Sequence, residues 1–151
     1  MKHNFRIMTA KRLISLLLFI TSSNLSFAQE YNSETIQYDG LTREYSIYVP
    51  TSYDGSTSFP LLFNFHGGGG DIASHIAIAD MRSIADTGNF IVVYPQARPD
   101  PSDGNSFNWI PKVSGTFDDV PFISSLIDTI ASNYEIDQNR IYACGYSLGG
   151  D

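Results

Sequence analysis

Residues 145–149 read Gly-Tyr-Ser-Leu-Gly, so a serine at position 147 stands between two glycines at fixed spacing. A serine hydroxyl becomes a nucleophile when a base takes its proton and a sharp turn after a strand exposes it. Glycines suit positions 145 and 149 because side chains there would clash across such a turn. The pattern predicts Ser147 as an acyl-transfer nucleophile, with the backbone N–H of Leu148 directed at the oxyanion. The alternative is a glycine-rich turn that only joins a strand to a helix.

A second candidate feature is His66 followed by four glycines, residues 67–70, which we call the glycine loop together with His66. Without side chains, this backbone can approach a substrate carbonyl and turn its N–H groups toward it. We therefore expect Gly67 and Gly68 to supply the second oxyanion donor. The alternative is a phosphate-binding loop, but no Gly-Lys-Ser/Thr follows. His66 is expected to order the loop rather than act as a base.

The elements that position these motifs alternate between strands and helices. Alternating residues around the turn Asp39-Gly40 predict an N-terminal β-hairpin, in which Tyr45, Ile47 and Val49 share one face. Nearly continuous apolar runs predict three buried strands, of which the last leads directly into Gly145. The predicted strands are 35–38, 43–49, 61–65, 90–94 and 140–144.

Two helices are expected between the buried strands. Residues 75–87 carry apolar residues at helical spacing, with Ser74 as N-cap, Gly88 as the stop and His75 on the surface. The second helix is capped by Asp118 or Asp119, and its apolar stripe steps by three and four residues. Between them, 96–117 is expected to be a long loop. That apolar stripe comprises Val120, Ile123, Ile127, Ile130 and Tyr134. Strands that alternate with helices predict an α/β fold with a parallel sheet.

Charge and hydropathy divide the 151 residues into a leader and a single domain. Four of the nine basic residues and none of the 16 acidic residues precede position 29. The basic start, the short apolar run 13–20 and the small residues at 26 and 28 predict a signal peptide over 1–28, cleaved near Ala28-Gln29. The alternative, a membrane anchor, needs about 20 apolar residues. The mature domain, 29–151, is therefore expected to be secreted or periplasmic, with no membrane anchor after processing.

Composition also excludes several classes of function. A net charge of −7 argues against a nucleic-acid partner. One cysteine, Cys144, excludes a disulfide-stapled miniprotein and a cysteine-based zinc site. We expect no metal and no cofactor.

The motifs, taken in order, resemble a known family. The chain is similar to secreted α/β-hydrolase esterases of the polyhydroxybutyrate depolymerase and feruloyl/acetylxylan esterase group (carbohydrate esterase family 1-like). The matching stretches fall within 41–151 and include 43–50, 60–69, 92–96, 108–109, 118–120 and 136–150. The resemblance implies the N-terminal part of an α/β-hydrolase fold, with the nucleophile after the fifth strand, and a serine esterase that acts on polymeric or polysaccharide-linked acyl esters.

In that fold the acid and the histidine follow the serine in chain order. No histidine follows Ser147 here, and Asp151 lies too close to the turn to be the acid. Asp118, Asp119 and Asp137 suit caps and turns. We therefore expect an N-terminal half truncated after the serine turn, inactive by itself because it lacks the acid and base. In a longer parent, Trp109 and Tyr146 are candidate substrate-binding residues, although packing under the loop is an alternative for Trp109.

Two other functions remain open. A secreted serine peptidase of the prolyl-oligopeptidase type shares the serine turn but usually carries a large extra domain. A non-catalytic binding module could keep the turn without a triad. Residues downstream of 151 would separate the binding module from the two enzymes.

Overall fold

The computed structural model describes residues 30–109 and 118–151. The predicted signal peptide, 1–28, lies outside these residues. The chain begins with the predicted antiparallel hairpin of β1 (Asn32–Tyr38) and β2 (Leu41–Tyr48). Asp39 and Gly40 both take positive φ, 50° and 71°, as a tight two-residue hairpin turn requires. The hairpin prediction is confirmed, with β1 starting three residues earlier than expected.

The hairpin joins a five-stranded mixed sheet in the order β1-β2-β4-β3-β7. β2 pairs antiparallel with β4, whereas β3 pairs parallel with both β4 and β7. The three parallel strands are β3 (Phe59–Phe65), β4 (Ile91–Pro95) and β7 (Ile136–Gly145). Because β3 and β7 run in the same direction, the glycine loop and Ser147 both follow the carboxyl ends of these strands, on the same side of the sheet.

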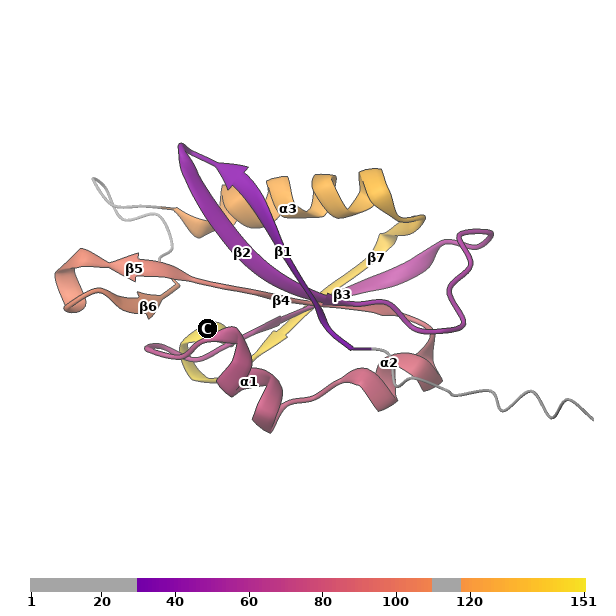
Figure 1. The fold of residues 1–151 in the computed structure, drawn as a ribbon, viewed down its shortest axis with the longest axis horizontal. Coiled ribbons are helices and arrows are strands. Elements are labelled where there is room, and N and C mark those ends of the chain that lie inside the picture. Colours follow the sequence, from indigo (N-terminus) through magenta and orange to yellow (C-terminus); the bar gives the residue numbers. More distant parts are fainter. Residues whose placement is uncertain (1–29, 110–117) are drawn as a thin grey trace, which may run out of the picture.

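Helices cover both faces of this sheet (Figure 1). On one face lies α3 (Asp119–Asn133), packed over a core that includes Ile47, Phe63 and Val93. On the other face lie α1 (Ile72–Ile78) and α2 (Arg82–Gly88), over a smaller core with Tyr48 and Tyr94. The alternation of faces along β2 and β4 thus divides the apolar side chains between two cores.

The prediction of one helix over 75–87 is wrong, because the chain forms two short helices there. The break is stabilised by β4: Oη of Tyr94 donates to the carbonyl of Ala79 (2.6 Å) and accepts from the N–H of Met81 (3.1 Å). The N-cap is Asp71, whose carboxylate accepts from the N–H of Ser74 (2.7 Å). Ser74, predicted as the cap, is instead the third helical residue of a capping box.

His75, predicted on the surface, is buried, and its Nε2 bonds Oδ1 of Asn64 in β3 (2.8 Å). The asparagine explains the discrepancy, because a polar side chain inside the sheet needs a partner. At the other end of this segment, the helix ends one residue later than expected, because Gly88 is its last helical residue. Asn89 follows it with φ 51° as the C-cap.

The N-cap of helix α3 is Asp118, one of the two residues predicted for this position. Its predicted apolar stripe is shifted, however. The buried residues are Asp119, Phe122, Leu126 and Ile130, whereas Val120 is 68% exposed. Asp119 turns inward because Nη2 of Arg43 donates to its Oδ1 (2.8 Å), and the guanidinium lies 3.7 Å from the centre of the Phe122 ring. A buried ion pair from β2 therefore sets the rotation of the helix.

The predicted loop 96–117 is in part a second hairpin. Strands β5 (Arg98–Asp100) and β6 (Ser106–Asn108) pair antiparallel around a single 3-10 turn, η1 (Pro101–Asp103). Asp100 caps that turn, and Gly104 and Asn105 take positive φ, so turn chemistry makes the hairpin where no apolar alternation predicts one.

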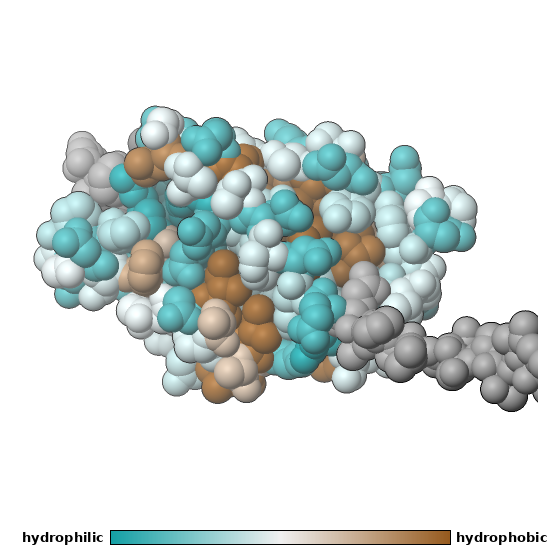
Figure 2. Space-filling model, viewed as in Figure 1, coloured by the Kyte–Doolittle hydropathy of each residue, from teal (hydrophilic) through white to brown (hydrophobic). Residues whose placement is uncertain are grey.

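The sequence predicts a buried strand at 140–144, and this is wrong for most of the length of β7. Among the described residues it pairs only with β3, and Tyr142 through Gly145 are exposed because the strand lies at the edge of the sheet. The visible face in Figure 2 is mainly polar with small apolar patches. None of the helices within 30–109 and 118–151 has the length and apolar character to cross a membrane.

Candidate active site

Ser147 lies on a strained turn directly after β7. Its φ is 51°, in the left-handed region that a non-glycine residue enters only at a cost. It opens a single 3-10 turn, η2 (Ser147–Gly149), and its side chain is exposed. The tight backbone bonds are Gly149 N–H to Tyr146 O (3.0 Å) and Gly150 N–H to Ser147 O (2.7 Å). We call residues 145–150 the elbow.

The positions of Gly145 and Gly149, which flank Ser147, have no room for a side chain. A Cβ on Gly145 would collide with the carbonyl of Gly149. A Cβ on Gly149 would collide with the carbonyl of His66 and would lie 2.6 Å from that of Phe65. Neither neighbour can move without displacing backbone, so the elbow presses directly on the end of β3.

The glycine loop lies against the elbow. A Cβ added to Gly67 would meet Tyr146 Cδ1 at 3.0 Å and Ser147 Cβ at 3.5 Å. A Cβ added to Gly68 would meet Leu148 Cδ2 at 3.2 Å. The structure therefore brings together Ser147, Leu148, Gly67 and Gly68, which the sequence placed 80 residues apart.

Some backbone N–H groups at the junction of the glycine loop and the elbow donate to an acceptor, and others do not. The N–H of Gly69 donates to the carbonyl of Phe107 (2.9 Å) and approaches Oδ1 of Asn108 (3.2 Å). The N–H of Gly70 donates to the carbonyl of Gly67 (3.1 Å). Within the described part of the chain, the N–H groups of Gly67, Gly68 and Leu148 donate to no acceptor. These three are the donors still available to an anionic oxygen.

His66 is the buried end of the glycine loop, at 1% exposure. Its Nε2 accepts from the N–H of Ala97 (3.1 Å) and lies 3.0 Å from Nε2 of Gln96. Since a backbone N–H can only donate, Nε2 carries no proton, and Nδ1–H donates to the carbonyl of Gly67 (2.7 Å). Burial lowers the pKa of His66 and so favours the neutral ring. The hydrogen bond to Gly67 acts in the opposite direction but has the smaller effect.

Neither described histidine is bonded to Ser147. Both ring nitrogens of His66 are engaged, and His75 faces Asn64 inside the sheet. Asp118 caps α3, and Asp137 accepts from the N–H of Asn139 and pairs with Arg140, which fits the cap and turn roles expected for them. Asp119 instead forms the buried pair with Arg43. Within 30–109 and 118–151, no cluster of three metal-binding side chains occurs.

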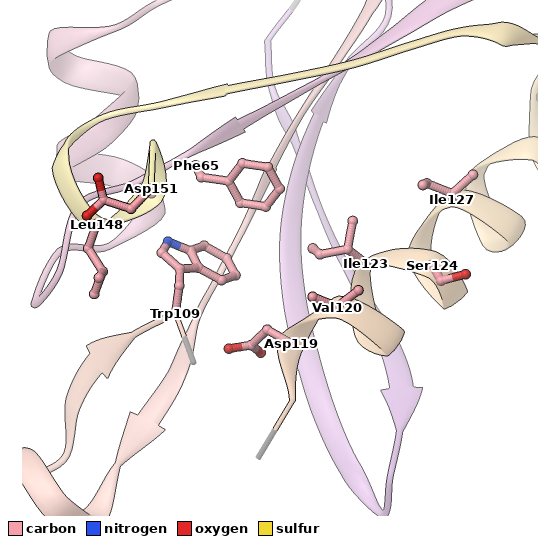
Figure 3. A pocket seen from close by; sticks show the side chains of 10 residues that line it. Phe65, Trp109, Asp119, Val120, Ile123, Ser124, Ile127, Leu148 and Asp151 are labelled. Atoms are coloured by element: carbon pink, nitrogen blue, oxygen red, sulfur yellow. The ribbon is translucent and has the colours of Figure 1, made fainter. Parts of the chain in front are cut away.

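A mostly apolar cavity of about 580 Å³ adjoins the elbow. In Figure 3, Phe65 and Trp109 face Ile123 of α3 across it, and Leu148 and Asp151 lie at its other end. Among the described residues, Ser147 does not line this cavity, so the cavity opens beside the Ser147 side chain rather than on it. Trp109 is half-buried and Tyr146 is exposed. Substrate contact by either residue stays a prediction.

Sequence reasoning missed the residues that hold the glycine loop from behind. Oε1 of Gln96 accepts a hydrogen bond from the N–H of Ile72 (3.0 Å), and its Nε2 lies 3.0 Å from Nε2 of His66. Asn108 lies against Gly69, and its Nδ2 donates to Asp103 (2.9 Å). Gln96 directly follows β4 and Asn108 ends β6, and both lie in stretches that match the esterase group, 92–96 and 108–109, although the sequence assigns them no role.

Several known proteins are similar to this chain in sequence. The chain is 32% identical over 111 residues to the bifunctional acetylxylan esterase/xylanase XynS20E of Neocallimastix patriciarum, covering 74% of this chain and 15% of that protein. It is 29% identical over 142 residues to the uncharacterized peptidase YuxL of Bacillus subtilis, covering 87% and 21%. It is 28% identical over 92 residues to poly(3-hydroxyalkanoate) depolymerase C of Paucimonas lemoignei, covering 60% and 22%.

Solved structures support the same fold. An S-formylglutathione hydrolase from Agrobacterium tumefaciens superposes with a TM-score of 0.66 at 17% identity, over 84% of this chain and 52% of that one. A ferulic acid esterase superposes with a TM-score of 0.62 at 18% identity, over 82% and 52%. No family model matches the chain.

The chain therefore has the α/β-hydrolase fold. Its sequence resembles the feruloyl, acetylxylan and polyhydroxyalkanoate esterase group, as the motifs predicted. It covers only 15–22% of the length of the three curated relatives named above.

Proposed function

We propose that residues 29–151 are the N-terminal part of a serine esterase domain. Oγ of Ser147 attacks the ester carbonyl and keeps the acyl group, the alcohol leaves with a proton, and water then releases the acid. The N–H groups of Leu148 and of Gly67 or Gly68 stabilise the oxyanion. The observation that carries this proposal is the strained Ser147, set against a loop in which the Gly67 and Gly68 amides have no acceptor within the described residues.

The base and acid of the reaction are proposed to come from residues other than those described. Ser147 needs a base within hydrogen-bond reach, and both described histidines are committed elsewhere. We therefore expect purified 29–151 to hydrolyse esters no faster than buffer. Serine-dependent turnover from this segment would contradict the assignment and direct attention to His66, His75 and Asp151.

The direct test is Ser147→Ala in the full-length protein, assayed on a short p-nitrophenyl acyl ester. Hydrolysis should fall by about 10³-fold or more, because the covalent route disappears while binding remains. Ser83→Ala is the matched control, since Ser83 is an exposed serine on α2, on the sheet face opposite α3. An unchanged rate in a well-folded Ser147→Ala protein would place the nucleophile elsewhere.

The relatives, rather than the cavity, support a substrate class. Their names specify acetylxylan and poly(3-hydroxyalkanoate), and the structural neighbour specifies ferulic acid. We propose a polymeric or polysaccharide-linked acyl ester, with the aromatic ring of Trp109 and the side chain of Tyr146 near the acyl or sugar part. Rates on matched feruloyl, acetyl and hydroxybutyrate esters would rank these candidates.

The similarity to peptidase YuxL supports a second candidate, a serine peptidase of the prolyl-oligopeptidase type. Both chemistries would use Ser147 and the same oxyanion donors. A peptidase should cleave a prolyl or alanyl p-nitroanilide at a rate comparable to the ester, whereas an esterase should favour the ester by orders of magnitude. A binding module would show neither activity.

The leader completes the proposal. We propose that residues 1–28 are a signal peptide and that the mature chain begins at Gln29, outside the cytoplasm. N-terminal sequencing of the exported product tests this directly. A product that keeps Met1 in the membrane fraction would contradict it.

A further inference from the structure

The first two peptide groups of the glycine loop are each held by their carbonyl oxygen. The carbonyl of His66 accepts a 2.7 Å bond from Nε1–H of Trp109. The carbonyl of Gly67 accepts from Nδ1–H of His66 (2.7 Å) and from the N–H of Gly70 (3.1 Å). Both side-chain donors thus act on backbone rather than on solvent or on each other.

Holding a carbonyl also aims the amide of the same peptide group. The peptide bond is planar and trans, so its C=O and N–H point in opposite directions. Trp109 therefore sets the direction of the Gly67 N–H, and His66 sets that of the Gly68 N–H. These are two of the three N–H groups at the junction that have no acceptor within the described residues.

Both side chains are themselves fixed. The ring of Trp109 packs edge-on against Phe65, with centroids 5.0 Å apart, and lies 5.0 Å from the ring of His66. His66 is held in its Nδ1–H form by the N–H of Ala97 and by Gln96. Glycine has no side chain that would hold its own backbone, so the loop depends on these donors for a single conformation.

We propose that Trp109 and His66 are positioning residues that aim the Gly67 and Gly68 amides at the oxyanion. This inference rests on the proposed function and adds a role that neither residue has as a base or a substrate contact. A correctly aimed donor gains strength as charge develops on the oxygen, so its loss lowers kcat more than it raises KM.

The first test is Trp109→Phe in the full-length protein, which removes the Nε1–H and keeps an aromatic ring against Phe65. We expect kcat on a p-nitrophenyl ester to fall about 10- to 100-fold, less than the loss of a whole oxyanion donor, with KM changed less than threefold. Tyr53→Phe is the matched control. It removes one equally local bond, from the N–H of Glu135 to Tyr53 Oη (2.6 Å), near the start of β3 and away from the elbow.

The second test separates the two nitrogens of His66. The side-chain amide of asparagine can reach the place of Nδ1 and donate to Gly67, whereas that of glutamine extends toward the place of Nε2. His66→Asn should therefore keep several-fold more kcat than His66→Gln at equal thermal stability. The ¹⁵N shifts of the His66 ring should also show a proton on Nδ1 and none on Nε2 at neutral pH.

The outcomes distinguish the inference from the proposed function. If Ser147→Ala abolishes hydrolysis while Trp109→Phe matches Tyr53→Phe, the positioning role is wrong and the esterase assignment stands. A rise in KM alone for Trp109→Phe, or a proton on Nε2 of His66, would also overturn it. If Ser147→Ala is fully active, the proposed function itself fails.

Discussion

The glycine loop and the elbow face each other across the site, but they are stabilised in different ways. Buried or half-buried side chains hold the loop: His66, Gln96 and Trp109 each bond its backbone or one another. Among the described residues, no side chain bonds the elbow, which depends on three backbone bonds and on the absence of Cβ atoms at its glycines. The comparison teaches that the glycine-loop side of the candidate site is stabilised by hydrogen bonds and the elbow side by steric fit.

The largest effect should come from breaking that steric fit. In Gly149→Ala the new Cβ would collide with the carbonyl of His66, so the elbow must separate from β3. We expect hydrolysis by the full-length protein to fall about as far as in Ser147→Ala, on the order of 10³-fold. Circular dichroism and ester turnover measure the fold and the site separately.

The control for Gly149→Ala is Gly104→Ala. Gly104 has φ 60° and open space around its Cβ position, so this change adds backbone strain of about 1–2 kcal/mol without a collision. If both variants retain activity equally, the close contact at Gly149 does not support the elbow.

A large effect on stability should come from the hydrogen-bonded side. Nη2 of Arg43 donates both to Asp119 and to the carbonyl of Gln96, and both members of the ion pair are buried. Arg43→Met should lower the free energy of unfolding by about 3–5 kcal/mol, because it removes the guanidinium that donates to the buried carboxylate of Asp119. Urea denaturation of the purified protein measures this.

The partner variant sharpens that prediction. Adding Asp119→Leu to Arg43→Met should recover part of the loss, since an apolar pair of similar volume avoids the desolvation cost. A double variant that is less stable than the single one would show that Asp119 contributes through partners other than Arg43.

The smallest effect should be on pH dependence. Burial lowers the pKa of both His66 and His75 from the ordinary value of 6.5. The unfolded chain therefore binds more protons in the window below 6.5, so stability from these groups is present above that pH and is lost as pH falls through the folded values.

The thermal midpoint should accordingly decline between pH 6.5 and 5.5, above the range where carboxylates titrate. His75→Gln removes one of the two contributions and should flatten the slope. A midpoint that rises on acidification in this window would reverse the sign and contradict the buried, neutral state of both rings.

Much of the fold could be predicted from local pattern. The hairpin turn needs positive φ at Asp39 and Gly40, which favours residues of these types, and continuous apolar runs identified β3 and β4. The helix at 72–88 could not be predicted as two pieces, because its break depends on a hydroxyl of Tyr94, which belongs to a strand that comes later in the sequence. Buried His75 was missed for the same reason, since its partner Asn64 is in another element.

By itself the sequence determined which groups are present for chemistry. These are a serine between glycines at 145 and 149, and a run of glycines after His66. Only the tertiary structure decided which of these amides have an acceptor: those of Gly69 and Gly70 donate to Phe107 and Gly67, whereas those of Gly67, Gly68 and Leu148 have no acceptor among residues 30–109 and 118–151. It also decided that Asp119 faces Arg43 and that Trp109 bonds the loop backbone. The physical reason is that a glycine's freedom is local, whereas the hydrogen bonds that remove it come from strands and loops distant in the sequence.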